Sequence, residues 1–341
     1  MSGLLNFNNM NKTFRRKRLS IDEYAEGILS GDRIILSRAI TLVESRLESD
    51  NELAEQVIKK ILPNTGNCLR LGITGVPGVG KSTFIESFGK YLTGIGKKIA
   101  VLTIDPSSQR TQGSILGDKT RMEELANDPN AYVRPSASGN TLGGVNSKTR
   151  ETLLLCEASG YDVVIIETVG VGQSETTVKG IVDFFLLLML SGAGDELQGI
   201  KRGIMEMADA IAINKADGDN INRSEMAKRE YQNALHMFPP TESGWVPKVL
   251  TCSAVEKKGM EKIWHLMLRY EEEMRKSGFF QRNRQQQNLE WMMQTIQYYL
   301  DLSFFNHPEI KSTMPELKKE VTEGLTPAIV AAKELLHRYK K

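Results

Sequence analysis

The chain has 341 residues, 40% hydrophobic and 25% charged, with a formal net charge of only +2. This composition is typical of a soluble globular protein, and so small a net charge gives no indication of nucleic-acid binding. The longest apolar run, Phe184 to Leu190, is far shorter than the ~20 residues that cross a bilayer, so we expect no membrane segment. The three cysteines are widely spaced and the four histidines are scattered, which argues against a disulfide framework and against a zinc site.

The start of the chain is basic. Its first acidic residue is Asp22, and the residues before it include Lys12, Arg15, Arg16, Lys17 and Arg18. Such a start fits a transit peptide, which would direct the protein to the mitochondrial matrix, or an N-terminal arm of a bacterial cytoplasmic protein. We favour the bacterial arm and a cytoplasmic location.

Helical patterns follow the basic arm as far as about Leu62. Ser20 and Glu23 have the spacing of a capping box, and apolar residues then recur at helical intervals. The segment Pro63-Asn64-Thr65-Gly66 is typical of a turn. We therefore assign residues 1–66 to an N-terminal basic arm and helical segment that packs against the rest of the protein.

Residues 67–270 alternate short apolar runs with helical patterns. Most of these runs are continuously apolar, as in strands that are buried on both faces of a parallel sheet. The predicted fold is therefore an α/β fold with a mainly parallel, doubly wound sheet, and ligands should bind beyond the carboxyl ends of its strands. The predicted strands are Cys68–Thr74, Lys98–Ile104, Tyr132–Arg134, Asp162–Ile166, Phe184–Leu190, Ala210–Ile213 and Lys248–Thr251.

Residues 271–341 are polar and helical. An apolar helical face runs from Leu289 to Leu300, and Thr326-Pro327 begins a last helix. A helical arm outside the sheet must bury such a face, and we expect it to do so against a second copy of the chain rather than against its own domain.

The first predicted strand leads into a phosphate-binding P-loop of the form G-x-x-x-x-G-K-[ST]. A predicted helix follows the loop, so its backbone N–H groups and the helix N-terminus face an anion. Lys81 would reach the β- and γ-phosphates, and the Ser82 hydroxyl would bind Mg²⁺. The loop consists of Gly75, Val76, Pro77, Gly78, Val79, Gly80, Lys81, Ser82 and Thr83.

An N-K-x-D element follows the sixth predicted strand and is typical of guanine recognition. Its residues are Asn214, Lys215 and Asp217, with Ala216 between them. The carboxylate of Asp217 can accept two hydrogen bonds from guanine, whereas adenine would leave that carboxylate unpaired. The segment after the next strand, Ser253, Ala254 and Val255, is placed to bring backbone N–H groups to the guanine oxygen.

Acidic residues at strand ends are candidates for magnesium binding and catalysis. Glu167 closes the fourth strand, where it could hold Mg²⁺ directly or through water. Asp105 follows the second strand and could orient the attacking water, while Asp118 could join the magnesium shell. Asp105 and Asp118 could equally be acidic residues of turns.

A glycine-rich loop, Ser191 to Gly203, follows the fifth predicted strand. Its start lies at the carboxyl end of that strand, so it should border the nucleotide. Loops of this kind can order on a γ-phosphate and release on hydrolysis, although a flexible connection would look the same. Lys201 is a candidate to turn toward the phosphates when a partner docks.

With these motifs in place, the chain resembles the MeaB/ArgK GTPases, the methylmalonyl-CoA mutase-associated GTPases of the G3E group. The resemblance extends from Ser20 onward and includes the stretches Asp105–Ser108, Gly117–Met122, Glu167–Glu175 and Gly194–Lys201. Glu167 departs from the Asp of general GTPases but fits the E-T-V-G-V-G-Q stretch of this family. The fold that the resemblance implies is a SIMIBI-type P-loop domain.

The resemblance also implies a function. Family members are homodimeric GTPases that use GTP and Mg²⁺, gate adenosylcobalamin loading, and protect or reactivate methylmalonyl-CoA mutase. Two alternatives stay open: a metallochaperone-type GTPase, which would require a Cys/His cluster, and a transport-linked nucleotide-binding protein.

Overall fold

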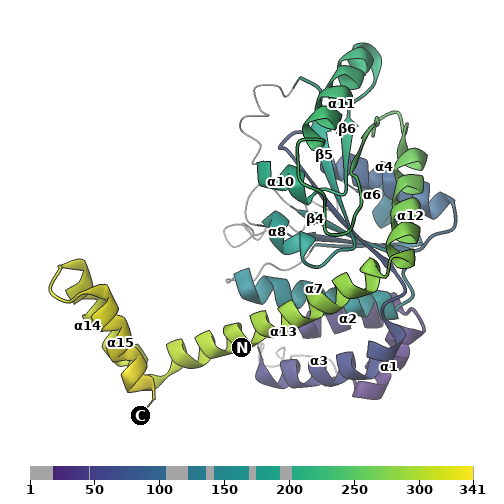
Figure 1. Cartoon of the computed structure of the whole chain (residues 1–341). Coiled ribbons are helices and arrows are strands. Elements are labelled where there is room, and N and C mark those ends of the chain that lie inside the picture. Colours follow the sequence, from purple (N-terminus) through teal and green to yellow (C-terminus); the bar gives the residue numbers. More distant parts are fainter. Residues whose placement is uncertain are drawn as a thin grey trace, which may run out of the picture.

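The computed structural model describes residues 18–45, 47–104, 122–135, 142–168, 174–192 and 202–340. These residues form a seven-stranded sheet between two helical layers, from which a long C-terminal arm extends (Figure 1). The strands are β1 (Leu69–Gly75), β2 (Ile99–Ile104), β3 (Ala131–Pro135), β4 (Val163–Thr168), β5 (Phe184–Leu190), β6 (Ala210–Asn214) and β7 (Lys248–Thr251).

The sheet has the strand order β3-β2-β4-β1-β5-β6-β7, and every neighbouring pair is parallel. All seven predicted strands are present, which confirms the predicted α/β fold. The fourth strand runs further than expected and includes Glu167, which pairs in register with Ile73 of β1. The central strands are apolar along their whole length because both faces of the sheet are covered.

Alternate residues of the central strands face two separate hydrophobic cores. Val163 and Ile165 of β4 belong to one core, and Val164 and Ile166 belong to the other. The first core packs under α4 (Lys81–Gly94), α6 (Glu123–Ala126), α11 (Ile221–Leu235) and α12 (Met260–Lys276). The second packs under α7 (Leu142–Ala158), α8 (Ser174–Lys179) and the N-terminal helices α1 (Ile21–Leu29), α2 (Arg33–Val43) and α3 (Glu48–Ile61).

The first N-terminal helix, α1, begins where the sequence predicts. Ser20 accepts a hydrogen bond from Glu23 N at 3.2 Å, and the Glu23 carboxylate accepts one from Ser20 N at 2.7 Å, which confirms the capping box. Asp32 caps α2 in the same way, by accepting from the N–H groups of Ile34 and Ile35. The apolar sides of these helices complete the second core rather than forming a core of their own.

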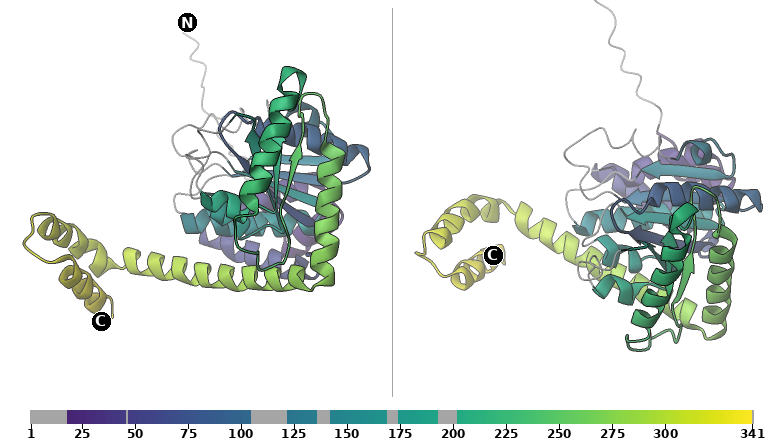
Figure 2. Two further views of the ribbon diagram at one scale, coloured as in Figure 1. Left: turned by 45° about the horizontal axis from the view of Figure 1, so that its top comes forward. Right: turned by 90° about the horizontal axis from the view of Figure 1, so that it is seen from above.

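The C-terminal arm starts at α13 (Phe279–Asn306), which turns sharply away from α12 at Gly278 (Figure 2). The first turns of α13 are buried against the sheet domain at Phe280, Arg284 and Gln287. Its second half extends beyond the domain and carries a hairpin of α14 (Pro308–Thr322) and α15 (Ala328–Tyr339). Its exposed apolar side chains include Leu289, Met292, Met293, Ile296, Tyr299 and Leu300.

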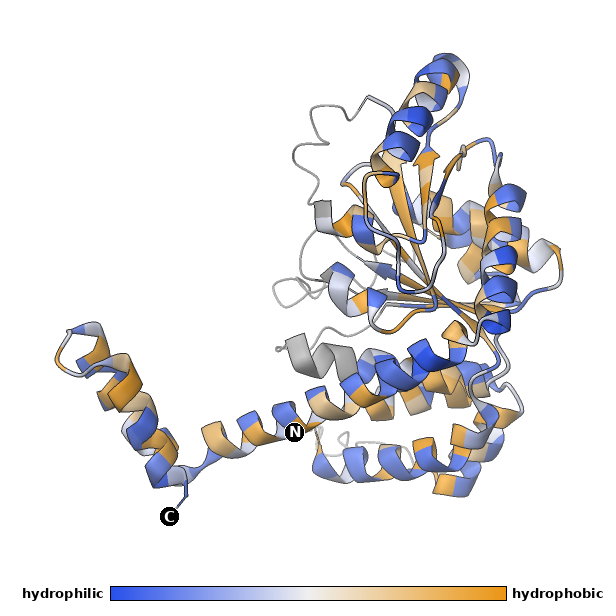
Figure 3. Ribbon diagram, viewed as in Figure 1, coloured by the Kyte–Doolittle hydropathy of each residue, from blue (hydrophilic) through white to orange (hydrophobic). Residues whose placement is uncertain are grey.

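The distribution of apolar and polar residues agrees with this architecture. The strands are strongly apolar, whereas the surrounding helices and the arm alternate apolar and polar residues (Figure 3). None of the described helices combines the length and the apolar character that a membrane-crossing segment requires.

Candidate functional site

The P-loop joins the carboxyl end of β1 to the start of α4, as the motif requires. Gly78 and Gly80 adopt φ values of +76° and +86°, which only glycine adopts readily, and such turns let successive backbone N–H groups face an anion. A Cβ on Gly75 would lie 2.5 Å from the Leu188 carbonyl oxygen, so the chain can pass close to β5 only with glycine there. The loop geometry therefore suits a bound phosphate.

Lys81 lies in the first turn of α4, and its ammonium donates to the carbonyl of Gly75 at 2.9 Å. Burial lowers the pKa of Lys81 from its ordinary value, while the carboxylates of Glu167 and Glu175 act in the opposite direction. The ammonium is thus held at the phosphate loop by a carbonyl, next to negative charge. A phosphate in the loop would supply further negative charge and favour the protonated form.

Ser82 and Glu167 come together from separate elements. The Ser82 hydroxyl donates to a carboxylate oxygen of Glu167 at 3.3 Å, and Glu167 is only 4% exposed at the end of β4. A hydroxyl and a carboxylate at this position are the oxygen donors that a hard cation such as Mg²⁺ prefers. The neighbouring hydroxyls of Thr74 and Thr168 bond to each other at 2.8 Å and fix β1 against β4 at this edge.

The guanine-motif residues lie at the same edge of the sheet and are tied to the P-loop. Asn214, the last residue of β6, donates to the Val79 carbonyl at 2.8 Å, and Lys215 donates to the Gly78 carbonyl at 2.9 Å. Lys215 has a φ of +60°, so its backbone turns sharply after the strand. These two contacts hold the N-K-x-D element beside the phosphate loop.

Asp217 is positioned by the segment that follows β7. Its carboxylate accepts a hydrogen bond from the Ser253 hydroxyl, and the N–H of Ala254 donates to the Asn214 side chain at 3.1 Å. The Val255 side chain is largely exposed next to them. Two loops that are far apart in the sequence are thus joined at one place, as a base-binding site requires.

Several candidates cannot be placed. Asp105, Asp118 and Lys201 lie outside the described residues, as does most of the glycine-rich loop. The roles assigned to them from the sequence stay predictions.

The structure adds two residues that the sequence did not single out. Glu175 of α8 is fully buried, and its negative charge acts on Lys81, so it belongs to the electrostatic surroundings of the phosphate loop. Ser87 of α4 donates to the carbonyl of Ala254 and ties the helix after the P-loop to the guanine segment. Glu175 closes the E-T-V-G-V-G-Q-S-E stretch, which could have marked it, whereas no sequence pattern marks Ser87.

Residues 36–308 match a family model described as "Methylmalonyl Co-A mutase-associated GTPase MeaB". The chain belongs to the MeaB family of GTPases. Its activity is therefore the hydrolysis of GTP to GDP and phosphate, which agrees with a P-loop and an N-K-x-D element at one edge of the sheet.

Relatives of this MeaB-family GTPase include named bacterial and animal proteins. "GTPase ArgK" of Escherichia coli is 50% identical over 288 residues, which cover 84% of this chain and 87% of the relative. "Methylmalonic aciduria type A homolog, mitochondrial" of Mus musculus is 44% identical over 330 residues, 94% of this chain and 80% of the relative. A solved structure described as "Crystal structure of LAO/AO transport system kinase" has a TM-score of 0.75 at 39% identity and covers 94% of this chain and 98% of that one.

Proposed function

We propose that this GTPase is a chaperone of adenosylcobalamin-dependent methylmalonyl-CoA mutase, which gates cofactor loading and protects or reactivates the mutase. The observation that carries the proposal is the match of residues 36–308 to a family described as mutase-associated. The name of the mouse relative, which refers to methylmalonic aciduria, points to the same metabolic area.

In this proposal the P-loop, Asn214, Lys215, Asp217 and the 253–255 segment bind GTP or GDP. Mg²⁺ is held by Ser82 and Glu167, with Asp118 in its shell, and Asp105 orients the attacking water. Lys81 stabilises the charge that develops on the transferring phosphate. The support comes from the part-buried contact between Ser82 and Glu167 and from the bonds that tie Asn214 and Lys215 to the loop.

The proposal divides the chain into an N-terminal segment (1–66), a GTPase domain (67–270) and a helical dimerisation arm (271–341). The apolar side chains exposed along α13 support a homodimer, because a soluble monomer rarely leaves a row of such residues in water. The bacterial relative supports action in the cytoplasm rather than in the mitochondrial matrix.

The metallochaperone alternative requires a cluster of metal ligands. Among the described residues, no group of three or more His, Cys, Asp or Glu side chains is arranged to hold a metal ion. The transport alternative rests on the name of one related structure, and the N-K-x-D element favours GTP over the ATP that a kinase would use.

Co-purification from the native host, with and without a non-hydrolysable GTP analogue, tests the partner. We expect methylmalonyl-CoA mutase to be retained in a nucleotide-dependent manner. Recovery of a metalloenzyme or a transport protein in its place would support an alternative and reject the mutase proposal.

The GTPase rate with and without saturating mutase tests the glycine-rich loop. Lys201→Ala should reduce the mutase-stimulated rate more than the basal rate, because Lys201 is proposed to reach the phosphates only when the partner docks. Lys60→Ala is a suitable control, because this lysine makes a surface ion pair with Asp22 on the N-terminal helices. Equal stimulation of wild type and Lys201→Ala would reject Lys201 as the coupling residue.

A further inference from the structure

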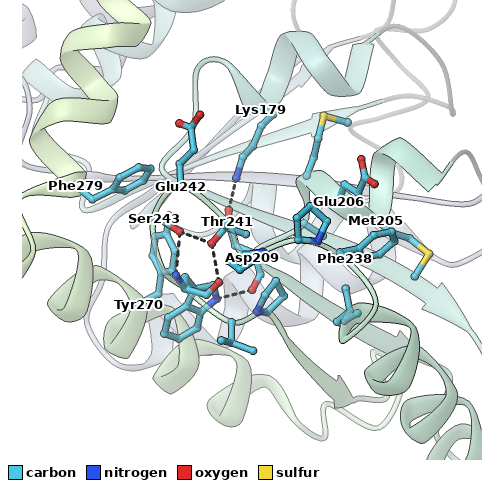
Figure 4. A pocket seen from close by; sticks show the side chains of 18 of the residues that line it. Lys179, Met205, Glu206, Asp209, Phe238, Thr241, Glu242, Ser243, Tyr270 and Phe279 are labelled. Atoms are coloured by element: carbon cyan, nitrogen blue, oxygen red, sulfur yellow. Dashed lines mark hydrogen bonds and ion pairs between the residues drawn. The ribbon is translucent and has the colours of Figure 1, made fainter.

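The pocket around Asp209 has a volume of about 580 Å³ and lies near the amino ends of β6 and β7, whose carboxyl ends face the nucleotide (Figure 4). Its walls come from α8, from α10 (Arg202–Met207), from the segment 235–247, and from α12 and the start of α13. Both signs of charge are present among its side chains, which include Lys179, Glu206, Asp209 and Glu242. This mixture does not select one class of ligand.

A much smaller cavity lies between the sheet domain and the base of the arm, where α13 packs along α7 (Figure 1). Its volume is about 20 Å³, enough for one water molecule or one monatomic ion but not for a phosphate or an organic ligand. Four polar side chains line it, and the rest of the lining is apolar. The polar side chains are Arg70 of β1, Arg150 of α7, and Asn288 and Trp291 of α13.

One buried donor in this lining has no partner. The indole nitrogen of Trp291, Nε1, is inaccessible to solvent and makes no hydrogen bond within the described part of the chain. A buried N–H without an acceptor is unfavourable and rare in native structures. The guanidinium carbon of Arg150 lies 5.9 Å from the centroid of the same indole ring, so the orphaned donor adjoins a cation.

The two guanidinium groups of the lining are held in fixed positions. Arg70 donates from Nε and Nη2 to the carboxylate of Glu157 at 2.7 and 3.1 Å, so the N–H groups of Nη1 lie outside this ion pair. Arg150 donates to the backbone carbonyls of Gln287 and Gly180, at 2.6 and 2.9 Å. Both cations are therefore fixed beside the cavity by groups on several elements.

The charges around the cavity favour an anion. Burial lowers the pKa of Arg150 to about 10, the charge of Glu290 raises it, and the charge of Arg70 lowers it, so the two guanidinium groups repel each other. Arg70, Arg150 and Trp291 can only donate hydrogen bonds, and among the polar side chains that line the cavity only the amide of Asn288 can accept one. A single atom that accepts from several donors and carries negative charge matches this lining.

We propose that this cavity binds one halide ion, chloride under physiological conditions, between Arg70, Arg150 and Trp291. The ion accepts a hydrogen bond from the indole N–H and offsets the repulsion between the two guanidinium groups. Because Arg70 belongs to β1 and Trp291 to α13, the bound ion joins the arm to the sheet domain. The site is separate from the nucleotide site, so the proposal does not depend on the mutase role.

Bromide locates the site, because it resembles chloride and scatters anomalously. Crystals of the full-length protein with GDP and Mg²⁺, which keep the phosphate loop occupied, would be soaked in sodium bromide. We expect an anomalous peak in the cavity beside Trp291 Nε1. A cavity that holds water and no bromide would overturn the proposal.

Variants test the site in solution. Trp291→Phe removes the indole N–H and keeps an aromatic ring, and Asn288→Asp places a carboxylate at the cavity, where it repels an anion. Each should raise the chloride dissociation constant about tenfold or more, because a charge-assisted hydrogen bond is lost or opposed. Asn233→Asp makes the same change on an exposed side chain of α11 and should leave the constant unaltered.

The constant is measured from the rise of the melting temperature with chloride, at saturating GDP and Mg²⁺, while sodium gluconate holds the ionic strength constant. An ion that binds only the folded state raises this temperature, and gluconate is too large for the cavity. No chloride dependence in the wild type, or the same dependence in all four proteins, would show that the cavity binds no halide.

Discussion

Arg284 of α13 makes a bidentate ion pair with Asp183, with guanidinium nitrogens 2.7 Å from Oδ1 and 2.6 Å from Oδ2. The same guanidinium donates to the carbonyls of Gly66 and Cys68, each at 2.7 Å. Asp183 directly precedes β5 and Cys68 directly precedes β1. One buried side chain therefore fastens the base of the arm to the strand that leads into the P-loop.

The first prediction concerns this ion pair. Arg284→Met should lower the free energy of unfolding by about 3–5 kcal/mol, because it leaves the Asp183 carboxylate buried without its partner. Urea unfolding followed by tryptophan fluorescence measures the change. Adding Asp183→Leu should recover part of the loss, because the double variant buries no unpaired charge.

Lys276→Met is the control for Arg284→Met. It removes an exposed ion pair with Glu272 on α12, and we expect no measurable change in stability. A loss of stability in Arg284→Met no larger than in this control would show that the buried pair does not hold the arm.

The second prediction uses the pKa of Glu157, whose carboxylate accepts from Arg70 and from the N–H of Gly66. Burial alone would raise this pKa, but the hydrogen bonds and charge of Arg70 outweigh burial and lower it. The contribution of Glu157 to stability is thus present at neutral pH and is lost as the pH falls through the lowered pKa. Below the ordinary value of about 4.3, the unfolded state binds the proton first.

Glu157→Gln should therefore be less stable than wild type at neutral pH, and the difference should shrink as the solution is acidified. Urea midpoints measured from neutral pH to below the glutamate range test this. Glu230→Gln, an exposed change on α11, should show no such trend. A constant difference at every pH would contradict the proposed ionisation.

The third prediction concerns base selection. Asp217→Asn should weaken GTP binding by about 10- to 100-fold, because a charged hydrogen-bonding partner is lost, and should improve xanthosine triphosphate binding. Competition titrations against a fluorescent guanine nucleotide measure both effects. Asp219→Asn, two residues away and exposed, should leave GTP affinity unchanged. Wild-type protein that binds ATP as tightly as GTP would reject the guanine assignment.

The fourth prediction concerns hydrolysis. Lys81→Ala and Ser82→Ala should each lower the GTPase rate by about 10²–10³-fold, because each removes preorganised stabilisation of the transferring phosphate. Circular dichroism should show that both variants keep their fold. Lys97→Ala, which lies on the surface after α4, should retain normal turnover. Near-normal rates in both P-loop variants would exclude the proposed mechanism.

Much of the fold could be predicted because it depends on local patterns. Continuous apolar runs identified all seven strands, and Ser20 with Glu23 marked the first helix start. The P-loop and the N-K-x-D element could be placed at one edge of the sheet because parallel strands bring their carboxyl ends together. Their connection through Asn214 and Lys215 required the folded chain, because these residues are far from the P-loop in the sequence.

Other features of the structure could not be predicted from local sequence patterns. Arg284 and Gln287 lie in a run of arginine, asparagine and glutamine that is typical of an exposed helix, yet both are buried. Their burial is favourable only because Asp183 and the carbonyls of distant segments satisfy their donors. The pocket around Asp209 could not be predicted from the sequence either, because its walls come from segments spread over about a hundred residues.

The attachment of α13 also has a mechanical consequence. The helix has 28 residues, about 42 Å at 1.5 Å per residue, and it is anchored at only one end. The part of the helix beyond Gln287, its last buried residue, is about 28 Å long, so a tilt of about 0.1 radian there would displace the far end by about 3 Å. The arm is thus a long helix whose point of attachment lies beside the strand that leads into the phosphate loop. A small change in the orientation of the anchored turns would therefore move the hairpin by several times as much as it moves the anchor.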